Sequence, residues 1–399
     1  NLGGKRSLAF LSRKNMKYVG GLKLPGVNEV GRFYWANNER VVIKVNQRQA
    51  WRKKSLPYGE LYAVNIDGSG GEMIYGYRSV KRRVGNSKGT KFKEKERTKG
   101  WADIIDMLPE DNKHILISST PWDNQGDRMA SVLKLNIYNG KINKKRITGS
   151  PISYATFFTD GKGEIKAVSG INKNSQTQLF TMKNDEWYQV PSSGLGESFR
   201  ALSINEEGTH LFALDNYKQD LTGLFKLNLT NGNYKNIFTD SKVDITNIEM
   251  TTDRNSFYAL RVDDGFPAYL LMNQKLEESK VFKGLVATFP NQLVNITSKS
   301  DDGKIFIVRV SSDVEAGNFY VFDKSSNQLT SLFSYFPNVK SDQLVYTDPF
   351  NFTASDGSSI SGYFTQGQSH VEGKIAPLVV LVHGGPHSRD YWRYSKRVQ

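Results

Sequence analysis

The chain has 399 residues, of which 38% are apolar and 24% charged, so it can form a sizeable core in two or three domains and is not expected to be disordered. It contains no cysteine, which excludes disulfides, thiolate zinc sites and a cysteine nucleophile. A three-histidine metal site would need distant members of a set of only five histidines, so we expect no metal and no cofactor.

The chain opens at Asn1 without a methionine or a signal-like apolar stretch, and we expect that upstream residues have been removed. Cytoplasmic and periplasmic locations both fit the sequence, so its compartment is left open. The first residues with strand character, 7–24, predict the last part of a β unit.

Much of the net charge of +14 lies in one basic segment. Residues from Arg78 to Lys99 include ten lysines and arginines but only two acids, Glu94 and Glu96. We interpret this segment as a solvated insertion between two strands, with a polyanion-binding site as the alternative. No nucleic-acid partner is expected, because no RNA-recognition or zinc-finger pattern accompanies the charge. No membrane span is expected, since no apolar run approaches about 18–20 residues.

From about residue 28 to residue 336, short apolar runs separated by Asp, Asn and Gly turns repeat six times. In one register the turn precedes the strand, and the first apolar residues after it are Val41, Ile115, Ile165, Leu211, Phe257 and Ile305. In the other register the strand precedes the turn, and the aligned residues are Val64, Leu135, Met182, Leu227, Leu271 and Phe322. Outside the interval that contains the basic segment, both registers advance by 44–51 residues.

A period of about 40–50 residues with four short strands per unit is typical of a β-propeller. We therefore predict an all-β, seven-bladed propeller whose first blade is incomplete, and we expect no helix among residues 100–335. A β-sandwich array with coincidental spacing is the alternative. His114 and His210 are expected to be ordinary sheet residues. The expected outer strands are residues 73–77, 143–149, 187–190, 234–238, 279–282 and 329–333.

The periodicity ends after Pro337. Residues 348–366 predict a hairpin around the Asp356-Gly357 turn. The five apolar residues Leu378–Val382 suit a strand buried on both faces, as in an α/β sheet. They end at His383-Gly384-Gly385, a pattern typical of an oxyanion-hole loop, where backbone N–H groups approach a developing negative oxygen to about 2.7–3.1 Å.

Four segments together resemble the N-terminal part of the prolyl oligopeptidase family of serine peptidases, in its acylaminoacyl-peptidase and dipeptidyl-aminopeptidase branch. They are Val30–Ile43, Leu61–Ser69, Phe352–Phe364 and Leu378–Trp392, and the last is the most specific. The resemblance covers essentially the whole chain. It implies a seven-bladed propeller over residues 1–340 that restricts access to an α/β-hydrolase domain, which begins at residues 341–399 and is truncated before the nucleophile.

The resemblance also implies residue roles. The backbone N–H of Gly385 would be one oxyanion donor, His383, Gly384 and Pro386 would shape its loop, and His387 would begin the following helix. The family nucleophile lies in a Gly-x-Ser-x-Gly elbow well downstream of such a loop, and the base follows it. We expect no such elbow and no Ser-Asp-His triad in these 399 residues, and hence no peptidase activity of this chain alone.

The resulting hypothesis is a serine peptidase that hydrolyses short peptides through an acyl-enzyme. A non-enzymatic propeller used as an interaction module, or a relative with a degraded triad, is the alternative. The expected partners are peptide substrates, the remainder of its own hydrolase domain, and another copy of the chain in a homo-oligomer. Glu94, Glu96 and the Asp263-Asp264 pair are candidates for holding a substrate amine, with a solvated loop acid as the ordinary interpretation of each.

Overall fold

The computed structural model describes most of the chain, namely residues 4–52, 54–79, 99–122, 128–142, 147–191, 194–205, 207–368, 373–385 and 388–399. The chain divides into two compact units. The first comprises residues 1–193, 204–211 and 227–233, and the second comprises residues 194–203, 212–226 and 234–399. Antiparallel strands make up nearly all of the regular structure in both units.

The first unit opens with a two-stranded sheet and continues with a four-stranded one. The two-stranded sheet confirms the strands expected in residues 7–24 and pairs β1 (Leu8–Leu11) with β2 (Tyr18–Leu22). The four-stranded sheet has the order β3 (Asn28–Trp35), β4 (Arg40–Gln47), β5 (Leu56–Asn65) and β6 (Glu72–Tyr75). Its outer strand β6 confirms the strand expected at residues 73–77.

A seven-stranded sheet follows, in which two expected four-stranded units share one strand. Its order is β7 (Gly100–Asp106), β8 (His114–Pro121), β9 (Met129–Asn136), β10 (Thr148–Thr159), β11 (Ile165–Ile171), β12 (Thr177–Lys183) and β13 (Glu186–Gln189). The first half of β10 pairs with β9 and the second half with β11, and the register shifts between Ser153 and Thr156. Tyr154 lies inside this shift with a φ of +53°, a backbone conformation that is strained for a bulky residue.

In the first two of these larger sheets, the residues aligned in one sequence register pair with those aligned in the other. Val41 of β4 pairs with Val64 of β5, and Ile115 of β8 pairs with Leu135 of β9; all four side chains are 0% exposed. In these two sheets the repeated residues are therefore cross-strand partners in the core, where each large aliphatic side chain contributes about 1.5–3 kcal/mol by burial. In the later sheets the two registers are offset, since Leu271 pairs with Ala259 and Phe322 with Phe306. His114 and His210 begin β8 and β15, as expected of sheet residues.

The later sheets keep the same meander. One sheet contains β14 (Arg200–Ile204), β15 (His210–Asp215), β16 (Gly223–Asn228) and β17 (Tyr234–Phe238). The next has three strands, β18 (Asn247–Met250), β19 (Phe257–Asp264) and β20 (Phe266–Leu271). The last of the series contains β21 (Leu293–Lys299), β22 (Ile305–Ser311), β23 (Asn318–Asp323) and β24 (Gln328–Ser334).

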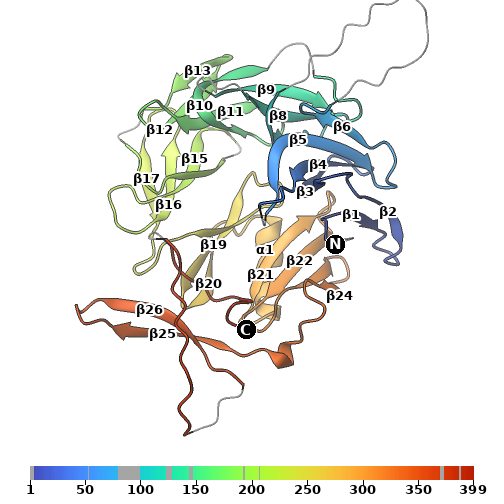
Figure 1. Ribbon diagram of the computed structural model, residues 1–399. Coiled ribbons are helices and arrows are strands. Elements are labelled where there is room, and N and C mark those ends of the chain that lie inside the picture. The colour runs from blue at the N-terminus through green and yellow to red at the C-terminus, as the bar shows by residue number, and fades with distance from the viewer. Residues whose placement is uncertain are drawn as a thin grey trace, which may run out of the picture. The chain divides into compact units, whose positions relative to one another are not determined.

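The expectation of an all-β chain is wrong at one element. The outer strand predicted at residues 279–282 is part of helix α1 (Glu277–Thr288), which packs against β19 and β21 (Figure 1). Val281, Phe282 and Leu285 are buried in the shared core and have helical rather than alternating spacing. Two glutamates in the first turn favour the helix through its dipole, and one of them, Glu278, pairs with Lys299 at 2.7 Å.

The predicted hairpin is confirmed at β25 (Thr347–Thr353) and β26 (Ser359–Thr365), with Asp356-Gly357 in its turn. A short 3-10 helix, Ser341–Gln343, precedes it. Of the other expected outer strands, residues 187–190, 234–238 and 329–333 are found in β13, β17 and β24. The one at 143–149 falls largely outside the described residues, and its end, from Thr148, is the start of β10.

Candidate active-site segment

The apolar run before the predicted oxyanion loop is not a strand. Leu378–Val382 has no strand pairing among the described residues, and its side chains are 55–84% exposed. The buried strand expected for a complete α/β sheet is therefore not formed by the described residues. Such a strand is stable only when neighbouring strands satisfy its backbone and cover both faces. The described residues include no strand placed to do so.

The loop itself is open. His383, Gly384 and Gly385 are exposed, and the Nδ1 atom of His383 lies 3.0 Å from the carbonyl oxygen of Gly384. A Cβ built on Gly384 would meet no atom within 4 Å. The ring of His383 therefore contacts its own neighbour in the chain, while Pro386 and His387 lie outside the described residues.

The segment after the loop is held against the β19–β20 hairpin. The Arg389 guanidinium donates a hydrogen bond to the carbonyl oxygen of Asp263, and its carbon lies 5.0 Å from the Tyr391 ring centroid. Trp392 is 6% exposed and packs edge-to-face on Phe266, with ring centroids 5.7 Å apart. The hydroxyl of Tyr363 donates to the carbonyl oxygen of Gly265 at 2.8 Å, so the β25–β26 hairpin also touches this turn.

A second anchor lies at the turn between β22 and β23. The backbone N–H of Tyr394 donates to the carbonyl oxygen of Ser312 at 2.8 Å. The side chain of Gln399 accepts from the Val345 N–H at 2.9 Å and donates to the Val345 carbonyl at 2.7 Å. Asp313 is 2% exposed and accepts from the Thr347 N–H at 2.6 Å. The chain before the hairpin and the chain after the loop are therefore fastened to the same turn.

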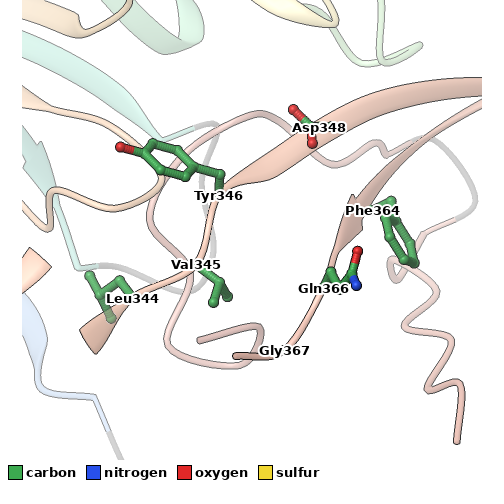
Figure 2. Close-up of a pocket in the computed structure, with 7 residues that line it drawn as sticks. All are labelled: Leu344, Val345, Tyr346, Asp348, Phe364, Gln366 and Gly367. Atoms are coloured by element: carbon green, nitrogen blue, oxygen red, sulfur yellow. The ribbon is translucent and has the colours of Figure 1, made fainter. Parts of the chain in front are cut away.

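An open hollow lies at the base of the β25–β26 hairpin (Figure 2). Its volume is about 370 Å³, which is within the size range of small-ligand pockets. Figure 2 shows that side chains from both strands line it, with Asp348 as its one carboxylate. The lining residues are Leu344, Val345, Tyr346, Asp348, Phe364, Gln366 and Gly367. Tyr346 is 73% exposed, so the hollow has the character of a surface recess.

The acids singled out in the sequence have structural partners. Asp263 is 4% exposed, pairs with Arg261 at 3.0 Å and accepts from the Asn247 amide at 2.9 Å. Asp264 pairs with Lys242 at 3.0 Å on the surface. Asp263 is thus engaged within its own sheet and Asp264 with the connection that precedes β18, while Glu94 and Glu96 lie outside the described residues.

Glu249, a buried acid next to this pair, was not singled out in the sequence. It is 6% exposed, and burial raises its pKa although Asn295 donates a hydrogen bond to it at 2.8 Å. Glu249 sits in an ordinary strand pattern, so only its position opposite Asn295 on β21 distinguishes it. Within the described ranges no group of three potential metal ligands occurs, and no helix there is long and apolar enough to cross a membrane.

One sequence expectation needs a correction. Residues 85–89 read Gly-Asn-Ser-Lys-Gly and match the letters of a Gly-x-Ser-x-Gly elbow. They lie in the basic segment, outside the described residues, and follow Lys81-Arg82-Arg83 rather than an apolar strand. A nucleophile elbow is a strand-to-helix turn that comes after the oxyanion loop in chain order. Ser87 meets neither condition, so the match does not supply a nucleophile.

Comparison with known proteins gives the class first. A prolyl endopeptidase structure, from a study of two such enzymes, aligns with 87% of this chain and 48% of that chain at a TM-score of 0.52 and 10% identity, which shows a β-propeller fold. Prolyl oligopeptidase B from Galerina marginata aligns with 86% of this chain and 47% of that chain, at 9% identity and a TM-score of 0.44. No family model matches the sequence.

The sequence comparison finds one relative. Dipeptidyl aminopeptidase BIII of Pseudoxanthomonas mexicana is 27% identical over 198 residues, which are 47% of this chain and 28% of that enzyme. The chain is thus similar in part of its sequence to that enzyme, and in its fold to the propeller region of a prolyl endopeptidase. It spans about half the length of the prolyl endopeptidase that it matches.

Proposed function

We propose that this chain is part of a serine peptidase that hydrolyses short peptides through an acyl-enzyme. Residues 1–340 would form a seven-bladed propeller, its first blade being the β1–β2 sheet, and residues 341–399 the start of the α/β-hydrolase domain. The family relationship to a dipeptidyl aminopeptidase supports the reaction class. Peptides are accordingly the proposed substrates, and the propeller would limit their access to the nucleophile.

The observation that carries the proposal is the attachment of the segment after the glycine loop to the β19–β20 hairpin. Arg389 and Trp392 follow Gly385 by only a few residues and are bound to the β19–β20 hairpin. A propeller that served only as an interaction module would have no need to hold a His-Gly-Gly segment in this way. The attachment supports a loop whose position relative to these sheets matters for chemistry.

The proposed role of Gly385 follows from the charge that develops in acyl transfer. When a serine hydroxyl attacks a peptide carbonyl, the carbonyl oxygen becomes an oxyanion, and a backbone N–H within about 2.7–3.1 Å stabilises it. Glycine permits this approach because it has no Cβ. The serine, the acid and the histidine base are proposed to follow the loop in the protein, in the order that the hydrolase fold uses.

A pair of variants of the gene product that carries this sequence tests the proposal. Gly385→Pro removes the N–H, whereas Gly385→Ala keeps it. With a chromogenic dipeptide substrate, kcat for the proline variant should fall by about 10²–10³ and should fall much less for the alanine variant. Equal kcat values for the two variants, at unchanged melting temperature, would exclude an oxyanion role for this N–H.

Two further measurements test the reaction class. Turnover by the gene product should be abolished by a serine-directed phosphonate, and the 399-residue polypeptide alone should show no turnover. A gene product without phosphonate-sensitive turnover would support a degraded triad instead. Phosphonate-sensitive turnover by the 399 residues alone would contradict the proposed position of the nucleophile.

A further inference from the structure

A row of neighbouring aromatic rings in tilted contact, with one arginine, lies beside strands β7–β10. The Tyr77 and Trp122 rings are 5.3 Å apart, and the Trp122 and Trp101 rings are 5.9 Å apart. The Arg128 guanidinium carbon then lies 5.5 Å from the Trp101 centroid and 5.4 Å from that of Tyr154. We call these five residues, Tyr77, Trp101, Trp122, Arg128 and Tyr154, the aromatic ladder.

Arg128 is the one charged member of the ladder. Its side chain is exposed, and no described carboxylate forms an ion pair with it. Arg78, which lies over the Tyr77 ring at 5.4 Å, differs because it pairs with the fully buried Glu60. Rings that flank a guanidinium hold its plane but leave its N–H edge free to bind a planar oxyanion in a bidentate manner.

The backbone conformation at Tyr154 and the close packing at Trp101 fix the positions of the two exposed rings of the ladder. Tyr154 is 57% exposed and has a φ of +53°, because it lies where β10 changes from pairing with β9 to pairing with β11. Strained residues of this kind occur preferentially at ligand-binding sites. Trp101 is 36% exposed, and its backbone packs closely on Gly59: a Cβ added to Gly59 would lie 2.3 Å from the Trp101 Cα.

The ladder contains one further unused polar group. The indole N–H of Trp122 is shielded from solvent and has no hydrogen-bond acceptor among the described residues. A buried donor without an acceptor is unfavourable. A ligand carbonyl that reached this N–H after a small movement of the ring would remove that cost. The ladder therefore offers one ligand the Arg128 cation, the Trp122 N–H donor and three further rings that are exposed or half-buried.

Trp122 follows β8 and Arg128 precedes β9, the second and third strands of their sheet. Within the second unit, two turns between second and third strands, β19–β20 and β22–β23, contact Arg389 and Tyr394. In that unit, this position of the repeat is therefore used to hold another part of the chain.

We infer that the aromatic ladder is a binding site for an acidic side chain of a peptide, with an apolar or aromatic residue next to it stacking on Trp101 or Tyr154. The choice of a peptide rests on the proposed function; the choice of a carboxylate rests on Arg128. This site would make the protein prefer peptides with an Asp or Glu in the segment that reaches it.

Binding to the 399-residue chain tests the inference without any turnover. The probes are N-acetylated, C-amidated Ala-Phe-Glu-Ala and its uncharged counterpart Ala-Phe-Gln-Ala, followed by calorimetry or by quenching of tryptophan fluorescence. The Glu peptide should bind at least tenfold more tightly at low salt. Arg128→Gln should abolish that difference, and Arg128→Lys should retain only part of it, because lysine cannot stack or bind in a bidentate manner.

Arg309→Gln is the matched control, since Arg309 is also stacked on an exposed tyrosine, with its guanidinium carbon 5.9 Å from the Tyr335 centroid. It should leave both affinities unchanged, and circular dichroism should show that all variants are folded. Equal affinities of the two peptides, or equal losses in Arg128→Gln and Arg309→Gln, would overturn the inference. So would Arg128-dependent binding of a tetranucleotide that displaces the Glu peptide and binds more tightly.

Different results would contradict the inferred ladder site and the proposed function. Absence of peptide binding with phosphonate-sensitive turnover in the gene product would overturn only the ladder site. Glu-selective binding without any such turnover would overturn only the proposed reaction.

Discussion

The indole N–H of Trp392 donates a hydrogen bond to the carbonyl oxygen of Thr347 at 3.0 Å. Thr347 begins the β25 strand, and Trp392 lies in the segment after the glycine loop, so this bond joins the two ends of the region that carries the loop. The same indole packs on Phe266 of the β19–β20 hairpin. A single buried ring thus connects the β25–β26 hairpin, the segment after the loop and the β19–β20 hairpin, although Trp392 itself lies in no helix or strand.

Removal of this ring should release the segment. Trp392→Ala deletes a buried aromatic side chain, a change that typically costs about 3–5 kcal/mol, whereas Trp392→Phe keeps a ring and loses one hydrogen bond worth about 1 kcal/mol. Limited trypsin digestion should therefore cleave after Arg393 much faster in the alanine variant and only a few times faster in the phenylalanine variant. Trp51→Ala is the control, because Trp51 is 80% exposed. Equal cleavage rates in Trp392→Ala and Trp51→Ala would show that the ring does not hold the segment.

Gly59 should be intolerant of any side chain. It has a φ of +79°, and an added Cβ would lie 2.3 Å from the Cα of Trp101 and 2.9 Å from the Ala102 nitrogen. Because both obstacles are backbone atoms, Gly59→Ala must displace β5 from β7, and we expect a loss of about 2–4 kcal/mol in the free energy of unfolding. Gly26→Ala separates the two causes: Gly26 has a φ of +60° but no atom within 4 Å of its Cβ, so only the backbone cost of about 1 kcal/mol should appear. Urea denaturation of both variants measures the difference.

The sequence was informative wherever strand and turn chemistry repeat. Val41 with Val64 and Ile115 with Leu135 could be aligned by counting alone, because a recurrent turn fixes the register of the strands on either side. The hairpin at Asp356-Gly357 was readable for the same reason. These features depend on short-range backbone preferences, which are fully encoded in neighbouring residues.

Features that depend on tertiary context were missed. Residues 279–282 read as a short strand, but helix α1 forms because Phe282 and Leu285 find a core between β19 and β21. Strand β10 is shared by two repeats, because its partner changes from β9 to β11 after Ser153. No local sequence pattern marks this change. Arg389 and Trp392 stood inside a quoted motif, yet their role became clear only from the distant residues Asp263 and Phe266 that they contact.

Glu249 should destabilise the fold as pH rises. Burial raises its pKa in the folded state above the ordinary value of 4.5, so its contribution to stability is fully present below the unfolded value and is lost as pH rises through the folded value. Glu249→Gln removes the titration while the side-chain oxygen can still accept from Asn295. We expect the variant to be more stable than the parent at pH 7 and no more stable near pH 3.5. Urea midpoints measured at several pH values test this, and a gain that does not depend on pH would contradict it.

Asp111 should show the opposite pH dependence of stability to Glu249. It pairs with Lys134 at 2.7 Å and with the His114 ring at 3.0 Å at the start of β8, and these hydrogen bonds hold its pKa below the ordinary value of 3.8 although partial burial opposes them. An acid with a depressed folded pKa contributes stability that is present above the unfolded value and is lost as pH falls through the folded value. Asp111→Asn should therefore lower the free energy of unfolding at pH 7 by about 1 kcal/mol or less, since the pair is partly solvated, and the difference should shrink below pH 3. The same urea series measures it. A loss at pH 7 that persists unchanged at pH 2.5 would mean that Asp111 acts through packing rather than through its charge.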